Sequence, residues 1–278
     1  SYIVTIPTGF SRALVRGEWP QILVEADATD PTATANALGA LSEIVRTALA
    51  RELVGPLAGL APGTLPVDVV IHRRYNPEGI SSYNIVPGLL GVILTMTTIL
   101  MTSLAITREV ERGTIENLLA MPARPSEIMA GKIIPYIGFG FVQVAVILVA
   151  SQLLFDVPMH GSLALLLAVT LLFIAANVTL GYTISTVARS QMQAMQMTFF
   201  FFLPSLLLSG FMFPFLGMPG WAQVIGEAIP LTHFLRVVRG IMLKGATFPE
   251  VWPSVWPLVA VWAVLAAIAL LRYRRTLD

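Results

Sequence analysis

Residues 163–187 read LALLLAVTLLFIAANVTLGYTISTV and contain no Asp, Glu, Lys, Arg or His. A helix rises about 1.5 Å per residue, so roughly 20 apolar residues cross the ~30 Å hydrocarbon layer of a bilayer. The length and composition of this run therefore predict a transmembrane helix.

Four further stretches have the same character. They are Val86–Ile106, Ile133–Phe155, Met195–Phe215 and Val255–Leu271. All 33 Lys, Arg, Asp and Glu residues lie between or outside the five stretches. The predicted fold class is a mainly α membrane protein, a polytopic helical bundle with five spans.

Overall composition agrees with a membrane protein. The 278 residues are 56% hydrophobic and only 12% charged, whereas soluble domains carry roughly 25% charged residues. A net charge of +1 gives no basic footprint for nucleic acid. The absence of cysteine rules out disulfides, and His72, His160 and His233 are too far apart for a compact metal motif, so we expect no metal site.

Positive charges between spans favour the cytoplasmic side of a membrane. On one predicted side there are eight: Arg108, Arg112, Arg124, Lys132, Arg189, Arg272, Arg274 and Arg275. On the other side there are three: Arg236, Arg239 and Lys244. This bias places the C-terminus in the cytoplasm and residues 1–85 outside. Because no span precedes that outer region, we expect a first span that this sequence lacks, and six spans in the full subunit. The alternative is a five-span protein with a translocated N-terminal region.

Residues 1–85 predict a small extracytoplasmic α+β domain, followed by a transmembrane domain over 86–278. Alternation of apolar residues predicts strands at Tyr2–Ile6, Gln21–Ala26 and Val67–Ile71. A short helix is expected at Ser11–Arg16, and Asp30-Pro31 is typical of the start of a longer one. No cluster of acids or bases in this region suggests catalysis.

The loop 107–132 between the first two expected spans is rich in charge. Gly113 permits a sharp turn, Thr114 can cap a new helix, and Glu116 would lie in the first turn of that helix, where its dipole favours an acid. The spacing predicts a short, charged helix beneath the membrane. Two interpretations remain open here: a solvated turn, or a docking element for a cytoplasmic partner.

The segment 218–245 is too apolar for a plain loop. Pro219 is expected to begin a short helix carrying Trp221, and Pro230 a second helix with one apolar side. Its cations, including Arg239, would reach lipid headgroups. The pattern predicts a pair of re-entrant or interfacial helices on the outer side.

A few side chains inside the spans could either join helices or line a transport path. The polar candidates are Gln143, Asn177, Tyr182 and Ser185. The soft or aromatic candidates are Met195, Phe199 and Phe202.

Three strings resemble one family, the transmembrane permease subunits of ABC type-2 exporters. They are REVERGTIENLLAMPARPSEIMAGKIIPY (108–136), YNPEGISSYNIVPGLLG (75–91) and LSGFMFPFLGMPGWAQVIGEAIPLTHFLRVVRGIMLKG (208–245). The resemblance runs from about Ile3 to Arg272 and includes the outer α+β domain of one bacterial branch. Two departures are the absent first span and Met121, which stands where a Thr is common.

The resemblance implies roles for particular residues. It makes the loop a coupling helix that contacts a nucleotide-binding subunit. The matching positions are Arg108, Glu109, Glu111, Gly113, Thr114 and Glu116. It assigns the region of Pro219, Trp221, Pro230 and Arg239 to the outer exit, or gate. It also implies a second permease subunit, identical or paralogous, and two ATPase subunits.

The expected function is ATP-driven export of a hydrophobic or amphipathic compound, drug-like or lipid-like, across a bacterial inner membrane. Gly131-Lys132 lacks the rest of a Walker A motif, so we expect no ATPase activity and no cofactor in this chain, with ATP and Mg on the partner subunit. The alternative is a passive channel or an ion-coupled secondary transporter. An ion-coupled carrier usually keeps ionisable residues in its spans, and these spans have none. Motifs of an intramembrane enzyme are also lacking.

Overall fold

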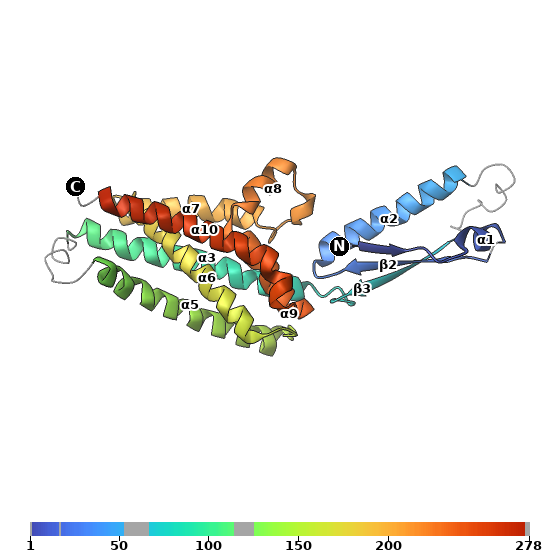
Figure 1. The fold of residues 1–278 in the computed structure, drawn as a ribbon, viewed down its shortest axis with the longest axis horizontal. Helices are drawn as coiled ribbons and strands as arrows, with labels where there is room; N and C mark the ends of the chain where they lie inside the picture. Colours follow the sequence, from blue (N-terminus) through green and yellow to red (C-terminus); the bar gives the residue numbers. More distant parts are fainter. Residues whose placement is uncertain (1, 17, 53–66, 114–124, 276–278) are drawn as a thin grey trace. The chain divides into compact units, whose positions relative to one another are not determined.

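The computed structural model describes residues 2–16, 18–52, 67–113 and 125–275. The chain divides into two compact units, Ser1–Asn84 and Ile85–Asp278. Figure 1 shows a small sheet with helices in the first unit and a bundle of long helices in the second.

The N-terminal unit has the predicted order of strands and helices. Its elements are β1 (Tyr2–Thr5), α1 (Phe10–Val15), β2 (Gln21–Asp27), α2 (Pro31–Glu52) and β3 (Asp68–Arg74). The sheet order is β1-β2-β3, with β1 antiparallel to β2 and β2 parallel to β3. Helix α2 begins at Pro31, as the Asp30-Pro31 pair predicts.

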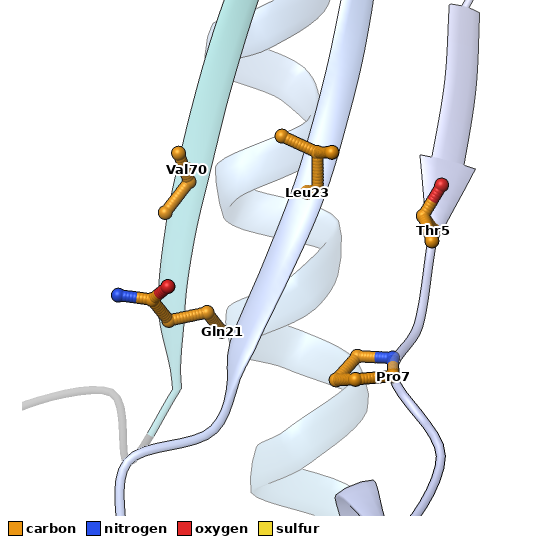
Figure 2. A pocket seen from close by; sticks show the side chains of 5 residues that line it. All are labelled: Thr5, Pro7, Gln21, Leu23 and Val70. Carbon is orange, nitrogen blue, oxygen red and sulfur yellow. The ribbon is translucent and has the colours of Figure 1, made fainter.

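Among the described residues of the N-terminal unit, only one face of this sheet is covered. Ile22, Val24 and Ala26 alternate along β2 and are buried in a cluster with Leu38 of α2. The opposite face is open, and Figure 2 shows Thr5, Leu23 and Val70 standing on it with the helix behind the sheet. A shallow hollow of about 450 Å³ lies over these side chains, bounded also by Pro7 and Gln21.

The second unit is built of helices. They are α3 (Ser81–Glu111), α5 (Pro125–Phe155), α6 (Leu163–Ser185), α7 (Gln191–Leu208), α8 (Gly220–Glu227), α9 (Pro230–Lys244) and α10 (Phe248–Arg275). Within the described residues, four helices are long and apolar enough to cross a membrane: Ser81–Glu111, Ile134–Phe155, Leu163–Ser185 and Phe248–Ala269.

The expected span Met195–Phe215 is not one continuous helix. Helix α7 starts earlier, at Gln191, and ends at Leu208, followed by Gly210 with a φ of +84°. Its first two turns also contain glutamines, which lower its hydropathy. For these reasons α7 is absent from the four helices that qualify by length and composition.

Helix α6 forms the centre of the bundle and contacts α5, α7, α9 and α10. Its Phe173 stacks on Phe234 of α9, with ring centroids 3.9 Å apart. A Cβ on Gly181 would lie 2.8 Å from the backbone oxygen of Ile99, so glycine is what lets α6 approach α3 so closely. Buried hydroxyls such as those of Thr95 and Thr170 donate to the carbonyl four residues earlier, which satisfies them without water.

Candidate functional site

The first candidate site is the end of the bundle where α3 stops. Glu111 is the last residue of α3, and its carboxylate accepts hydrogen bonds from Gln191 at the start of α7, at 2.8 Å from Nε2 and 3.3 Å from the backbone N. Gly113 follows with a φ of +67°, a conformation that suits the predicted turn. Arg108 and Glu111 are exposed, whereas Glu109 is half-buried.

These positions change one expectation. Glu111 belongs to the end of the long helix α3, and not to a separate short helix. Thr114 and Glu116, the expected cap and first-turn acid of that short helix, lie outside the described residues. What the structure adds is a link that sequence spacing does not reveal: Glu111 fixes the end of α3 to the start of α7, 80 positions later in the chain.

The second candidate site is the opposite end of the bundle, formed by α8 and α9. Pro219 is the N-cap residue of α8, and Pro230 is the first residue of α9, as predicted. Trp221 on α8 is 66% exposed. The apolar side predicted for the second helix is also present, because Phe234, Leu235 and Ile241 are at most 1% exposed.

The expectation that the cations of this segment reach headgroups is wrong for Arg239, and it stays a prediction for Arg236 and Lys244, which are exposed. The Arg239 guanidinium points into the protein, where Nη1 donates to the backbone oxygen of Gly210 at 3.2 Å. Arg236 donates two hydrogen bonds to the Glu227 carboxylate and lies 4.5 Å over the Phe215 ring. Helix α9 is packed against α6 and α10, and Arg239 finds its acceptor inside the unit, whereas the Arg236–Glu227 pair lies on the surface.

His233 lies beside this ion pair and is only 2% exposed. Its Nε2 is 2.8 Å from the Glu227 carbonyl oxygen and 3.7 Å from the Glu227 carboxylate. Burial lowers the pKa of His233, outweighing the Glu227 contacts that raise it. The hydrogen bond from Arg236 lowers the pKa of Glu227. Neutral His233 beside ionised Glu227 is therefore the arrangement favoured near pH 7.

Sequence reasoning did not single out Glu227 or His233. The signal was nevertheless present: His233 interrupts the apolar side of the helix that Pro230 begins, six residues after Glu227. A lone polar residue on a buried helix face needs a polar partner nearby.

The polar residues proposed within the spans are dispersed through the bundle. Gln143 on α5 accepts a hydrogen bond from Thr97 of α3 at 2.8 Å, so it joins two helices. Ser185 donates to the carbonyl of Tyr182 one turn earlier, and both residues are buried on α6. Asn177, 1% exposed, has a side-chain amide for which neither the N nor the O has a hydrogen-bond partner in the structure.

The soft residues of α7 face different ways. Phe199 is 39% exposed, Met195 is half-buried, and Phe202 is buried at 8% exposed. The structure thus leaves Phe199 on the surface of this subunit and turns Phe202 into the bundle.

Metal chemistry has no evident place in the described part of the chain. No group of three or more His, Cys, Asp or Glu side chains among those residues could hold an ion. What the two ends offer instead is an exposed carboxylate fixed between two helices, and, on α8 and α9, an exposed ion pair beside buried His233 and inward-pointing Arg239.

Comparison with known proteins covers both units. Residues 1–271 match the family described as ABC-2 family transporter protein. The probable multidrug ABC transporter permease YbhR of Escherichia coli (strain K12) is 30% identical over 273 residues, which are 98% of this chain and 73% of that protein. The inner membrane transport permease YhhJ of the same strain is 32% identical over 293 residues, covering 100% of this chain and 74% of that protein. ABC transporter G family member 20 of Dictyostelium discoideum is 29% identical over 209 residues, covering 74% of this chain and 29% of that protein.

Proposed function

The chain belongs to the ABC-2 transporter family as a multi-pass permease subunit, and on that premise we propose that it is the membrane-spanning half of an ATP-driven exporter. The match of residues 1–271, which takes in both units, carries this proposal. The cargo is a hydrophobic or amphipathic compound, moved outward across the inner membrane. The names of the two E. coli relatives, one a multidrug permease and the other an inner membrane permease, support that choice of cargo and location.

Energy for transport comes from a separate ATPase subunit in this proposal. The apolar stretches hold no ionisable side chain that could relay protons, and the sequence has no Walker A motif. ATP and Mg therefore belong to the partner, with two ATPase subunits serving two permeases. Permease pairing follows from size as well, because one subunit has few helices with which to enclose a large apolar path.

We also propose five crossings in this chain, with α7 as the fourth. Helix α7 starts beside Glu111 and ends where Arg239 of α9 bonds Gly210, so it runs from one end of the bundle to the other. An 18-residue helix is about 27 Å long, close to the apolar thickness of a bilayer. With the C-terminus in the cytoplasm, five crossings put residues 1–85 and the α8–α9 end outside.

The Glu111 end is then the face that meets the ATPase. Its exposed carboxylate is held by Gln191, so a cation of the ATPase that pairs with it would pull on α3 and α7 together. The loop beyond Gly113 would supply the rest of the docking surface. In the pair of permeases, exposed Phe199 is available to line the cargo path, whereas Phe202 and Asn177 are available only if the bundle opens.

The test is a charge reversal, Glu111→Lys, with Glu18→Lys as its matched control. Glu18 is an exposed glutamate that forms a long ion pair, 3.8 Å, with exposed Arg16. Removing one partner of a buried interfacial charge pair costs roughly 2–5 kcal/mol. We expect Glu111→Lys to reduce recovery of the ATPase with the permease, or to uncouple cargo-stimulated ATPase activity, while Glu18→Lys behaves as wild type.

Thr114→Ala gives a graded comparison in the same loop. Loss of a helix cap costs about 1 kcal/mol, so its effect should be smaller than that of Glu111→Lys. If Glu111→Lys equals wild type in both assays, the loop is a solvated turn and the coupling role is lost. A permease that moves its cargo with no ATPase present would instead support the channel or carrier alternative.

A further inference from the structure

Strand β3 is an edge strand of the N-terminal sheet, since among the described residues it pairs with β2 alone. On one side its backbone is bonded: Asp68 N–H donates to Pro20 O at 3.2 Å, and Arg74 O accepts from Ala28 N–H at 3.1 Å. In a parallel pair, alternate residues direct both backbone groups to the same neighbour. The backbone groups of Val69, Ile71 and Arg73 therefore point to the other edge.

This edge has the features of a docking site for another strand. Val70 and Ile71 are 38% and 39% exposed, and the residues from His72 to Arg74 are exposed too. A row of backbone N–H and C=O groups beside apolar side chains is a template for strand addition.

We propose that β3 pairs antiparallel with β3 of a second copy of this chain, with Ile71 opposite Ile71 of the partner subunit. This rests on the proposed function insofar as the exporter contains two identical permeases. A two-fold axis between the strands makes the contact isologous, so each copy offers the same surface. Val70 then lies opposite the partner's His72, and Asp68 lies opposite the partner's Arg74. Each of these pairs occurs twice because the contact is two-fold symmetric.

The charges of β3 select this direction. The strand reads DVVIHRR, with its acid at the first position and its arginines at the last two. Antiparallel pairing in this register puts Asp68 against Arg74, whereas a parallel register would put each arginine against its own copy. Like charges directly opposite each other are destabilising in a sheet, and opposite charges are favourable.

The side chains meet on consistent faces. Residues opposite each other in an antiparallel pair point to the same face. Asp68, Val70, His72 and Arg74 share the open face, where Figure 2 shows Val70 beside Leu23 of β2. On that face Arg74 is held by Glu25 at 2.6 Å, and Asp68 accepts from Gln21 at 3.2 Å. Both charges are thus positioned before the second copy arrives.

Disulfide trapping tests the pairing directly, because this chain has no cysteine. Residues opposite each other with exchanged backbone bonds have Cα atoms about 5.5 Å apart, within the ~4.4–6.8 Å range of disulfides. Ile71→Cys, in the complete complex with its ATPase in membranes, should shift from the monomer to the dimer position on a non-reducing gel after mild oxidation.

A second set of variants controls for chance collisions and for damage at Ile71. Asp68 and its own copy would be separated by six strand positions, about 20 Å, so Asp68→Cys alone and Arg74→Cys alone should stay monomeric. The double variant Asp68→Cys/Arg74→Cys should crosslink, because position 68 of each copy lies opposite position 74 of the other copy.

The outcomes separate this inference from the proposed function. Crosslinking of Ile71→Cys and of the double variant, but of neither single control, supports the pairing. A complex that retains its ATPase and two copies of this chain, yet gives no crosslink, overturns the pairing alone. Strand β3 would then be an edge strand whose charged residues prevent pairing with another strand. A complex with a different permease as the second subunit also overturns it. Failure to recover any ATPase would count against the proposed function as well.

Discussion

The two ends of the helical bundle use their charged side chains differently. At the α8–α9 end, Arg236 pairs with Glu227, and Arg239 reaches the Gly210 carbonyl. At the α3–α7 end, Glu111 is exposed and contacts a neutral side chain, Gln191. The first end is held by contacts within the subunit. The second leaves its charge on the surface, where a partner protein can reach it.

The difference suggests that one end maintains the structure of the subunit and the other end binds a partner. Charges that are bonded within the subunit make an end that keeps its shape, and an exposed carboxylate held by a neutral side chain makes an end that can dock. Changes at the α8–α9 end should therefore lower the stability of the subunit itself, while changes at the α3–α7 end should alter assembly and leave stability nearly unchanged.

The largest effect is expected from Gly161→Val. A Cβ at Gly161 would overlap the Ile241 carbonyl oxygen and lie 3.1 Å from its carbonyl carbon. Overpacking costs about 1–3 kcal/mol and occasionally more, and a branched side chain against backbone should reach the top of that range. The midpoint of thermal unfolding of the purified subunit should fall by several degrees.

Gly138→Val is the control for Gly161→Val. A Cβ at Gly138, in helix α5, would meet nothing within 4 Å. Equal unfolding midpoints for the two variants would show that the α8–α9 end is not tightly packed against the α5–α6 link, and the comparison between the ends would fail.

A smaller effect is expected from acid. Because the pKa of buried His233 is lowered in the folded protein, the unfolded chain takes up this proton first as pH falls below about 6.5. The stability contributed by neutral His233 is present above that pH and is lost as pH falls toward the folded-state pKa. The pKa of Glu227 is also lowered in the folded protein, so the stability contributed by ionised Glu227 is lost only as pH falls below about 4.5.

Thermal unfolding of wild type and His233→Gln between pH 7.5 and 5.5 measures this effect. We expect the wild-type midpoint to fall with pH and the variant to show a flatter profile, because glutamine does not titrate but keeps an N–H donor for the Glu227 carbonyl. Parallel profiles would mean that acid acts elsewhere in the subunit.

The smallest effect on stability is expected from Gln191→Ala. It removes the donor that holds the Glu111 carboxylate, at a partly exposed position where substitutions usually change stability by no more than about 0.5 kcal/mol. Its unfolding midpoint should match wild type while ATPase recovery declines, because the carboxylate is no longer fixed. An altered midpoint with normal assembly would reverse the roles given to the two ends.

The sequence predicted most elements because their signals are local. The strands of the N-terminal sheet follow alternation, and helices α2, α8 and α9 begin at or just after Pro31, Pro219 and Pro230. Long-range contacts leave no such signal. The bond between Glu111 and Gln191 joins residues 80 positions apart, and the inward turn of Arg239 depends on where Gly210 ends up in space.

The expected span Met195–Phe215 shows a different limit. Its mean apolar character suggested one long helix, but Gly210 adopts a positive φ and the chain turns there. Hydropathy indicates whether a segment can lie in an apolar environment, but it does not indicate where the backbone changes direction. The same limit applies to Arg239 of α9, which the sequence pattern placed among interfacial cations and which instead donates to the Gly210 carbonyl.

The link between α5 and α6 has a mechanical consequence. The backbone N–H of His160 donates to the carbonyl of Met242 at 3.0 Å, and Gly161 lies directly against Ile241. The last turn of α9 is thus clamped to the hairpin that joins two long membrane helices. A force that tilts α9 cannot be absorbed by a slack loop at this point. It would pass through this contact into α5 and α6, so the three helices are expected to move together.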